Sequence, residues 1–177
     1  DVFTRFDIPG TFAGAEPYGS GHINDTLLVT TAEADQPDYI FQRVNHRIFK
    51  DVPGLMENIA RVTEHVRFKL LAEGANADRE TLTLIKTRDG TWFDKTVEGD
   101  FWRAYLFIDK TVSYDIVKSP ELANEGGKAF GRFQYFLDDL PGGPLNETIV
   151  DFHNIASRLQ LFHDALDKDV KGRAKDI

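Results

Sequence analysis

The chain contains no cysteine in its 177 residues. This absence excludes disulfide bridges, thiolate metal sites and cysteine nucleophiles, and it fits a reducing cytoplasm. No apolar run approaches the ~18 residues that a membrane span needs. Basic residues are also in deficit, since 21 Lys and Arg face 29 Asp and Glu for a net charge of −8. A nucleic-acid partner normally requires a clustered basic face. We therefore expect a cytoplasmic protein with neither a membrane nor a nucleic-acid partner.

Two common catalytic patterns are missing as well. The five histidines show no H-E-x-x-H spacing, and no serine lies in a G-x-S-x-G elbow. Zinc-protease and esterase chemistry therefore lack support. What the chain does contain is 41% hydrophobic residues, including 14 Phe. That is enough for one buried core, or for a core divided between two lobes.

A glycine-bracketed turn that leads into an apolar strand is the most informative stretch. It reads Tyr18-Gly-Ser-Gly-His-Ile-Asn-Asp-Thr26. Glycines allow the backbone to approach an anion closely, and free N–H groups supply hydrogen-bond donors. The pattern indicates a loop that lies over the phosphates of a nucleotide. The alternative is an ordinary hairpin turn, which uses glycine in the same way.

Turn residues and periodicity predict strands, one helix, and strands again. Three strands fall between Phe12 and Asn45. A helix then opens with Asp51 as N-cap and Pro53 in its first turn, and Gly74 ends it. Its apolar face should pack on the sheet. Further strands are predicted over 81–86, 92–97 and 101–108, joined by Asp-Gly and Gly-Asp turns.

Two helices are predicted in the remainder of the chain. Ser119 caps the first and Pro120 enters it, and the Pro141-Gly-Gly-Pro144 segment breaks it. Apolar residues spaced from Ile149 to Leu166 line the second. The resulting fold class is α+β, with an antiparallel sheet of five or six strands and one inserted helix. We expect a nucleotide-binding lobe over 1–110, a helical lobe over 111–177 and a ligand cleft between them.

Phosphoryl transfer depends on donors and cations placed around the phosphates. The kinase order is a glycine loop, a basic residue on the third strand, and a helix carboxylate that holds this basic residue. The sequence offers the turn, then Arg43, then Glu57 or Glu64. Arginine would keep the charge of the usual lysine and add a planar fork suited to phosphate oxygens. Taken alone, Arg43 is better explained as a cation on the surface of a strand end, where arginine is usually exposed to solvent.

From these residues the chain resembles the aminoglycoside phosphotransferase and choline kinase superfamily, and more closely the N-acetylhexosamine 1-kinases, whose fold is protein-kinase-like. The resemblance covers nearly the whole chain. It rests on the glycine turn, on Tyr39-Ile-Phe-Gln-Arg-Val-Asn-His46, on Leu55–Ile59 with Val62–Val66, and on Phe152-His153.

The resemblance implies a set of site residues around ATP. The turn would lie by the phosphates, Arg43 would take the place of the third-strand cation, and Glu64 would be its partner. Glu64 points away from the apolar face of its helix, however, and a solvated carboxylate is the equal alternative. The segment after the last strand would offer backbone groups to adenine through Phe107 and Ile108. The implied residues of the turn are Gly19, Ser20, Gly21, His22, Ile23 and Asn24.

Two features of that superfamily are missing from this sequence. No His-x-Asp-x-x-x-x-Asn loop and no later metal-binding Asp follow the second helix, and Phe152-His153-Asn154 does not supply them. We therefore expect a fragment that is inactive alone, with no catalytic or metal-binding residue of its own. The ligands of Mg²⁺ would lie outside this chain.

The leading hypothesis is the nucleotide-binding part of an ATP-dependent sugar kinase that phosphorylates the anomeric hydroxyl of an N-acetylhexosamine. One alternative is a noncatalytic nucleotide-binding or interaction module. Another is a kinase of the same fold that acts on aminoglycoside or choline-type acceptors. The sequence leaves the acceptor and the oligomeric state open.

Overall fold

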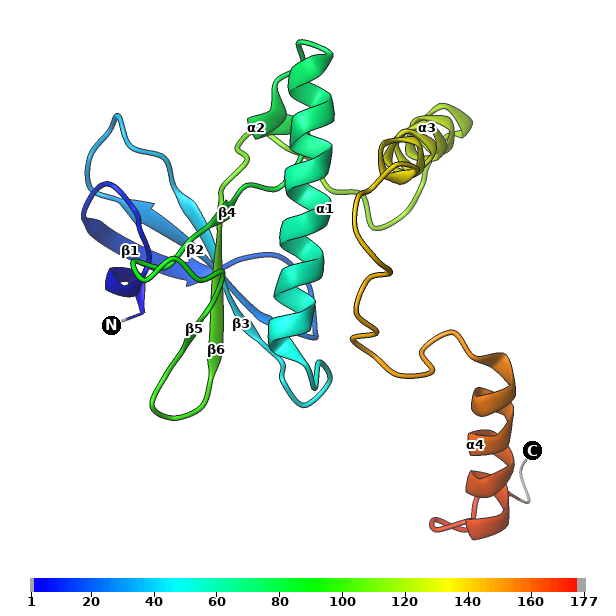
Figure 1. Ribbon diagram of the computed structural model, residues 1–177. Helices are drawn as coiled ribbons and strands as arrows, with labels where there is room; N and C mark the ends of the chain where they lie inside the picture. The colour runs from blue at the N-terminus through cyan, green and yellow to red at the C-terminus, as the bar shows by residue number, and fades with distance from the viewer. Residues whose placement is uncertain (1, 175–177) are drawn as a thin grey trace.

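The computed structural model describes residues 2–174 and has an α+β architecture built on one antiparallel sheet (Figure 1). Within these residues the sheet has six strands in the order β1-β2-β3-β6-β4, and β5 also pairs with β6. The last strand in sequence therefore lies next to the third, inside the sheet. The strands are β1 Phe12–Pro17, β2 Asp25–Thr31, β3 Tyr39–Val44, β4 Leu84–Ile85, β5 Asp94–Lys95 and β6 Phe101–Leu106.

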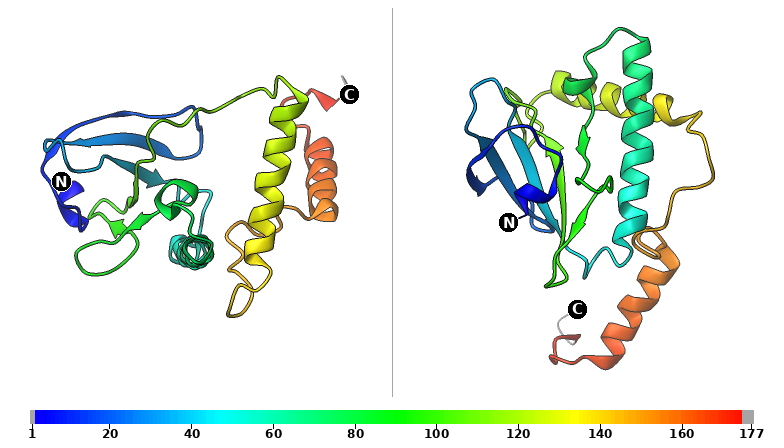
Figure 2. Two further views of the ribbon diagram at one scale, coloured as in Figure 1. Left: turned by 90° about the horizontal axis from the view of Figure 1, so that it is seen from above. Right: turned by 60° about the vertical axis from the view of Figure 1, so that its left-hand side comes forward.

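The long helix α1 lies between the sheet and α3 (Figure 2). Its start matches the predicted signals, because the Asp51 side chain accepts a hydrogen bond from the Gly54 amide and Pro53 lies in the first turn. Gly74, with φ of 73°, follows its end. The helices are η1 Phe3–Arg5, α1 Val52–Ala72, α2 Ala77–Glu80, α3 Pro120–Leu137 and α4 Ile155–Lys168.

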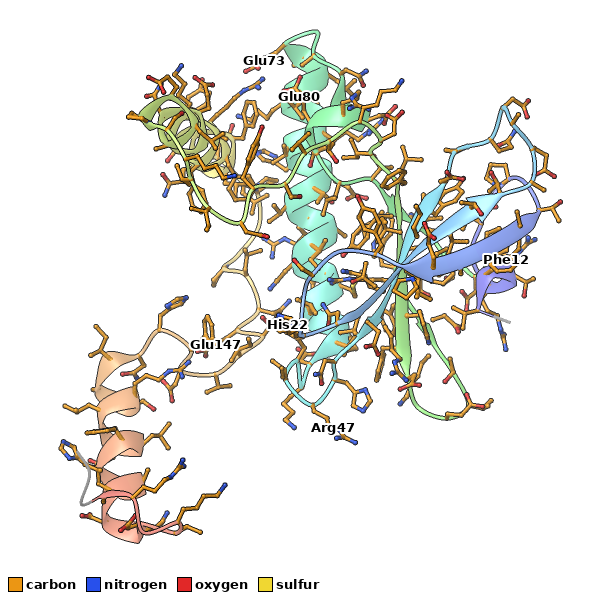
Figure 3. All side chains as sticks on the ribbon, turned by 180° about the vertical axis from the view of Figure 1, so that it is seen from behind. Phe12, His22, Arg47, Glu73, Glu80 and Glu147 are labelled. Carbon is orange, nitrogen blue, oxygen red and sulfur yellow. The ribbon has the colours of Figure 1, made fainter. Side chains whose placement is uncertain are left out.

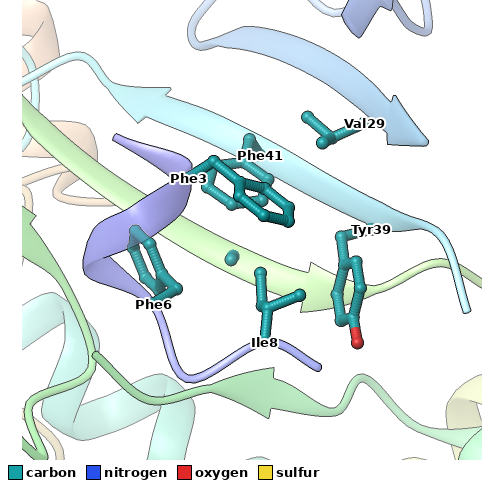
Figure 4. Close-up of a cluster of buried hydrophobic side chains, with 7 residues drawn as sticks. Phe3, Phe6, Ile8, Val29, Tyr39 and Phe41 are labelled. Carbon is teal, nitrogen blue, oxygen red and sulfur yellow. The ribbon is translucent and has the colours of Figure 1, made fainter. Parts of the chain in front are cut away.

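The outer face of the sheet is covered by the first residues of the chain (Figure 4). Phe6 is fully buried and its ring packs edge-on against Phe41 of β3, with 5.2 Å between the ring centroids. Phe3 stacks on the same ring at 6.0 Å. Burial of these aromatic rings gives the sheet a closed outer side. The side chains of this cluster are Phe3, Phe6, Ile8, Val29, Tyr39, Phe41 and Ala104.

The inner face of the sheet packs on α1. Val44 of β3 forms a buried cluster with Val52 and Met56 of the helix. Met56 and Ala60 are buried more deeply than Leu55 and Ile59, although helical spacing predicts Leu55 and Ile59 on the apolar face that packs on the sheet. The sheet therefore has apolar cover on both sides over much of its area.

Ion pairs and a small core attach α3 to α1 and α2. Phe136 is buried in a cluster with Val66 and Leu70. Arg132 of α3 donates to Glu73 at 2.8 Å and to Glu80 at 2.7 Å (the two glutamates are labelled in Figure 3). In contrast, α4 has no buried residue.

Several predicted boundaries differ from the structure. The predicted strands 81–86 and 92–97 shorten to β4 and β5, because α2 ends only at Glu80 and the hairpin between them leaves the sheet. The last helix begins at Ile155 rather than near Ile149, since a turn over 150–153 precedes its N-cap, Asn154. Neither η1 nor α2 was predicted.

The division into lobes 1–110 and 111–177 stays a prediction. Residue 1 and residues 175–177 of those ranges lie outside the described residues. Between β6 and α3 the chain runs without helix or strand over 107–119. None of the helices in the described part of the chain combines the length and apolar character required to cross a membrane.

Candidate functional site

A pocket of about 430 Å³ opens between the inner face of the sheet and the segment that follows β6. Strands β2, β3 and β6 make its floor, and they contribute the polar side chains of Thr26, Gln42, Arg103 and Tyr105. Tyr18, at the base of the glycine turn, lies at its rim together with Phe107. Tyr18 and Thr26, which flank the predicted turn, and the predicted 107–108 segment therefore line one cavity. None of the turn residues Gly19, Ser20, Gly21, His22, Ile23 and Asn24 lines it.

The glycine turn is an exposed loop between β1 and β2, where Figure 3 shows His22. The Tyr18 amide donates to the Thr26 carbonyl at 2.9 Å and closes its base. Gly19 has φ of 81°, a left-handed conformation that favours glycine, whereas Gly21 does not. Within residues 2–174, no hydrogen bond engages the amides of residues 19–23. The turn thus presents unused donors, as an anion-binding loop must.

The last residue of the predicted turn motif is used to hold the turn in place. The Asn24 side-chain oxygen accepts a hydrogen bond from the Asn45 amide at 2.9 Å. This bond ties the end of the turn to the end of β3, its neighbouring strand. Asn24 therefore positions the loop, and this role alone explains its carboxamide.

Two aromatic rings connect the turn to the segment after β6. Tyr18 and Phe107 pack edge-to-face with 5.5 Å between their centroids. The Phe107 amide donates to the Asp38 carbonyl at 2.9 Å, which fixes the start of the segment on the sheet. The next amide, of Ile108, has no hydrogen bond within the described residues, and neither has the Phe107 carbonyl. One donor and one acceptor of adjacent residues thus remain for a ligand.

Arg43 lies on the other face of the sheet. Side chains alternate along a strand, so Arg43 shares the outer face with Phe41, while Gln42 and Val44 face α1. Its guanidinium donates to Asp25 Oδ2 at 2.8 Å and to Asp100 Oδ2 at 3.3 Å. The hydrogen bonding of its guanidinium to the Asp25 carboxylate is the main reason that the pKa of Arg43 is raised.

The predicted ion pair between Arg43 and a helix carboxylate is not formed. Glu64 is exposed on α1 and makes no ion pair within residues 2–174. It lines, with Trp92, a separate recess of about 190 Å³ beside β4. Glu57, the other candidate, accepts a hydrogen bond from Asn146 at 3.0 Å. The structure does not bring Arg43 or Glu64 to the pocket.

Sequence reasoning missed the polar side chains that do line the pocket. Gln42 Nε2 donates to Thr26 Oγ1 at 2.9 Å, and Gln42 Oε1 accepts from Arg103 Nε at 3.1 Å and Nη2 at 2.9 Å. We call Thr26, Gln42 and Arg103 the polar row. One signal was available, because Arg103 is the only charged residue in the six-residue strand Phe101–Leu106.

Burial shifts the titration of the two β6 side chains on this face. Arg103 is 8% exposed and its guanidinium lies 5.2 Å from the centre of the Tyr105 ring. Loss of solvent lowers the pKa of Arg103 and raises the pKa of the Tyr105 hydroxyl to about 12. At neutral pH the pocket therefore holds a charged arginine and a neutral tyrosine.

No family model matches this chain. Among the described residues, no group of three or more His, Asp and Glu side chains could hold a metal ion.

Proposed function

We propose that this chain is the nucleotide-binding part of an ATP-dependent sugar kinase with a protein-kinase-like fold, whose acceptor is the anomeric hydroxyl of an N-acetylhexosamine. One observation carries the proposal. The glycine turn and the 107–108 segment, which lie far apart in the sequence, contact each other through Tyr18 and Phe107 at the rim of one pocket. The resemblance described above supplies the acceptor and the reaction class.

In this proposal each part of the pocket has a distinct task. A purine presents adjacent donors and acceptors at its edge, which the Phe107 carbonyl and the Ile108 amide can match. Ile40 and Leu82 give the pocket apolar walls, which suit a flat ring. The unused amides of the glycine turn would donate hydrogen bonds to phosphate oxygens. Because the described carboxylates do not form a metal site, we assign no magnesium ligand and no chemical step to these residues.

Gly21 provides a direct test, because it is open and unstrained. A Cβ added there would meet no atom within 4 Å, and its φ lies outside the left-handed region. The Gly21→Ala variant should therefore fold normally. If phosphates approach the turn closely, the added methyl group should weaken ATP binding roughly tenfold, or about 1.4 kcal/mol. Titration calorimetry with ATP on the 177-residue chain measures the change.

Gly143→Ala is the matched control. Gly143 also lies in an exposed loop, outside the left-handed region, with no atom within 4 Å of an added Cβ. Its ATP affinity should equal that of the unaltered chain. The proposal fails if ATP at millimolar concentration gives no binding heat and no rise in melting temperature, since a ligand specific for the folded state must stabilise it.

A further inference from the structure

Arg103 is a buried cation without an opposite charge. It is 8% exposed, and within residues 2–174 no carboxylate lies in ion-pair distance of its guanidinium. Its neighbours are the Gln42 oxygen, the Met56 sulfur and the ring of Tyr105. None of these carries a formal charge at neutral pH. A buried charge that is not compensated is strongly unfavourable.

The hydrogen bonds of Arg103 leave one edge of the guanidinium unused. A guanidinium carries five N–H donors in a planar fork. Nε and Nη2 donate to the same Gln42 oxygen, and Nη1 makes a long contact of 3.8 Å to Met56 Sδ. One N–H of Nη1 and one of Nη2 remain without a partner in the described part of the chain. Two donors on neighbouring nitrogens match two oxygens of one oxyanion.

Thr26 adds a further donor at the same place. Its Oγ1 accepts a hydrogen bond from Gln42 Nε2 at 2.9 Å, so its own hydroxyl hydrogen is free to be donated elsewhere. The residue lies at the base of the glycine turn and lines the same pocket as Arg103. Gln42 connects the two and holds both in position. The polar row therefore presents donors, and one positive charge, to a single cavity.

We propose that Arg103 and Thr26 bind a phosphate group inside this pocket, with Gln42 as the residue that positions them. The phosphate supplies the missing negative charge and accepts from the free edge of the guanidinium. The identification of that phosphate with the polyphosphate tail of ATP rests on the proposed function. The binding of a phosphate group itself does not.

The same geometry separates Arg103 from Arg43. The Arg43 fork is occupied by the carboxylates of Asp25 and Asp100, and its side chain is 46% exposed. A phosphate at Arg43 would have to displace two like-charged groups. Arg103, in contrast, contacts only the neutral side chains of Gln42, Met56 and Tyr105, so no negative charge has to be displaced. The inner face of the sheet therefore carries the anion site.

The test measures inorganic tripolyphosphate binding to the 177-residue chain by calorimetry at constant ionic strength. Arg103→Lys keeps the charge but loses the planar fork, and its affinity should fall roughly tenfold or more. Arg103→Met should abolish binding. Arg47→Gln, at an exposed loop residue with no side-chain partner among the described residues (Figure 3), removes the same charge elsewhere and should stay within about twofold. Arg43→Gln should behave like this control.

Melting curves verify that each variant folds. If Arg103→Met does not fold, Thr26→Val tests the same phosphate site. Loss of the hydroxyl should weaken tripolyphosphate several-fold while Arg103 remains. The proposal is overturned if tripolyphosphate does not bind the unaltered chain, if Arg103→Lys binds it normally, or if Arg43→Gln is the variant that loses it. The same titrations with ATP and with adenosine test the nucleotide proposal separately. If ATP binds no more tightly than tripolyphosphate and adenosine does not bind, the phosphate site is supported and the nucleotide proposal is refuted.

Discussion

Tyr105 shares the inner face of the sheet with Arg103, and burial controls its titration. The side chain is 5% exposed, and its pKa is raised from 10.0 to about 12. The hydroxyl therefore stays neutral in the folded state at pH values where the unfolded chain has lost that proton. Arg103 opposes this shift only in part, since the positive charge favours the phenolate.

This raised pKa predicts a loss of stability in alkali. Below pH 10 both states hold the proton, so the contribution of Tyr105 is constant. Between pH 10 and 12 the unfolded state releases the proton first, and the free energy of unfolding should fall by roughly 2–3 kcal/mol in total. Guanidinium denaturation at several pH values, compared with Tyr105→Phe, measures the effect. Other tyrosines and lysines titrate in both proteins and cancel, so parallel curves for the two would contradict the prediction.

The residues of the pocket and of the neighbouring glycine turn differ in how far the sequence predicts them. The turn from Gly19 to Asn24 is visible because glycine carries a backbone signal, and Phe107 and Ile108 follow from the end of a predicted strand. The sequence does not predict whether Gln42 or Arg43 faces the pocket. Both faces of β3 are apolar, with Tyr39 and Phe41 on one side and Ile40 and Val44 on the other. Alternation therefore cannot tell which face meets the helix, and only the packing of α1 decides it.

At the scale of elements, local signals predicted the long helices and the central strands well. Asp51 and Ser119 cap α1 and α3 as expected, through hydrogen bonds to the third residue that follows each. The two-residue strands β4 and β5 fall below what periodicity can resolve. Burial of η1 depends on Phe41, which lies far away in the sequence. A pattern confined to a short window contains no such information.

Helix α3 carries glycines that nothing in the structure requires. A Cβ at Gly126, Gly127 or Gly131 would meet no atom within 4 Å, and none of them is left-handed. Each change to alanine should therefore stabilise the folded state by roughly 0.5–1 kcal/mol, because glycine loses more backbone entropy in a helix. Chemical denaturation of Gly127→Ala measures this effect.

Gly54 in α1 is the matched control for this prediction. Its Cβ would collide with the carboxylate of the capping residue Asp51 and would lie 3.2 Å from the Cβ of Asn146. Gly54→Ala should therefore destabilise the protein although alanine is the better helix former. An equal gain from Gly54→Ala and Gly127→Ala would show that propensity alone controls both sites.

At the scale of the whole molecule, burial is uneven. The sheet, α1 and α3 share three buried clusters, whereas α4 contributes no buried residue and stands apart from the sheet (Figure 1). Apolar side chains of α4 such as Ile155 and Leu161 are well exposed. An isolated helix of 14 residues is marginally stable in water. We therefore expect the cooperative unit of unfolding to end before α4.

Two helix caps make this difference measurable. Asp51 accepts from the Gly54 amide at 3.0 Å, and Asn154 accepts from the Ser157 amide at 3.1 Å, so the two caps make the same hydrogen bond to the third residue that follows. Asp51→Ala should lower the free energy of unfolding by about 1 kcal/mol, because α1 packs on the sheet. Asn154→Ala should leave global unfolding unchanged and only speed amide exchange in 155–168.

Hydrogen exchange followed by mass spectrometry should find those amides fast, and the amides of β3 and β6 slow, already in the unaltered chain. Equal protection of the two regions, or equal global effects of the two cap variants, would mean that α4 belongs to the cooperative unit and that its apolar side chains contribute to the same core.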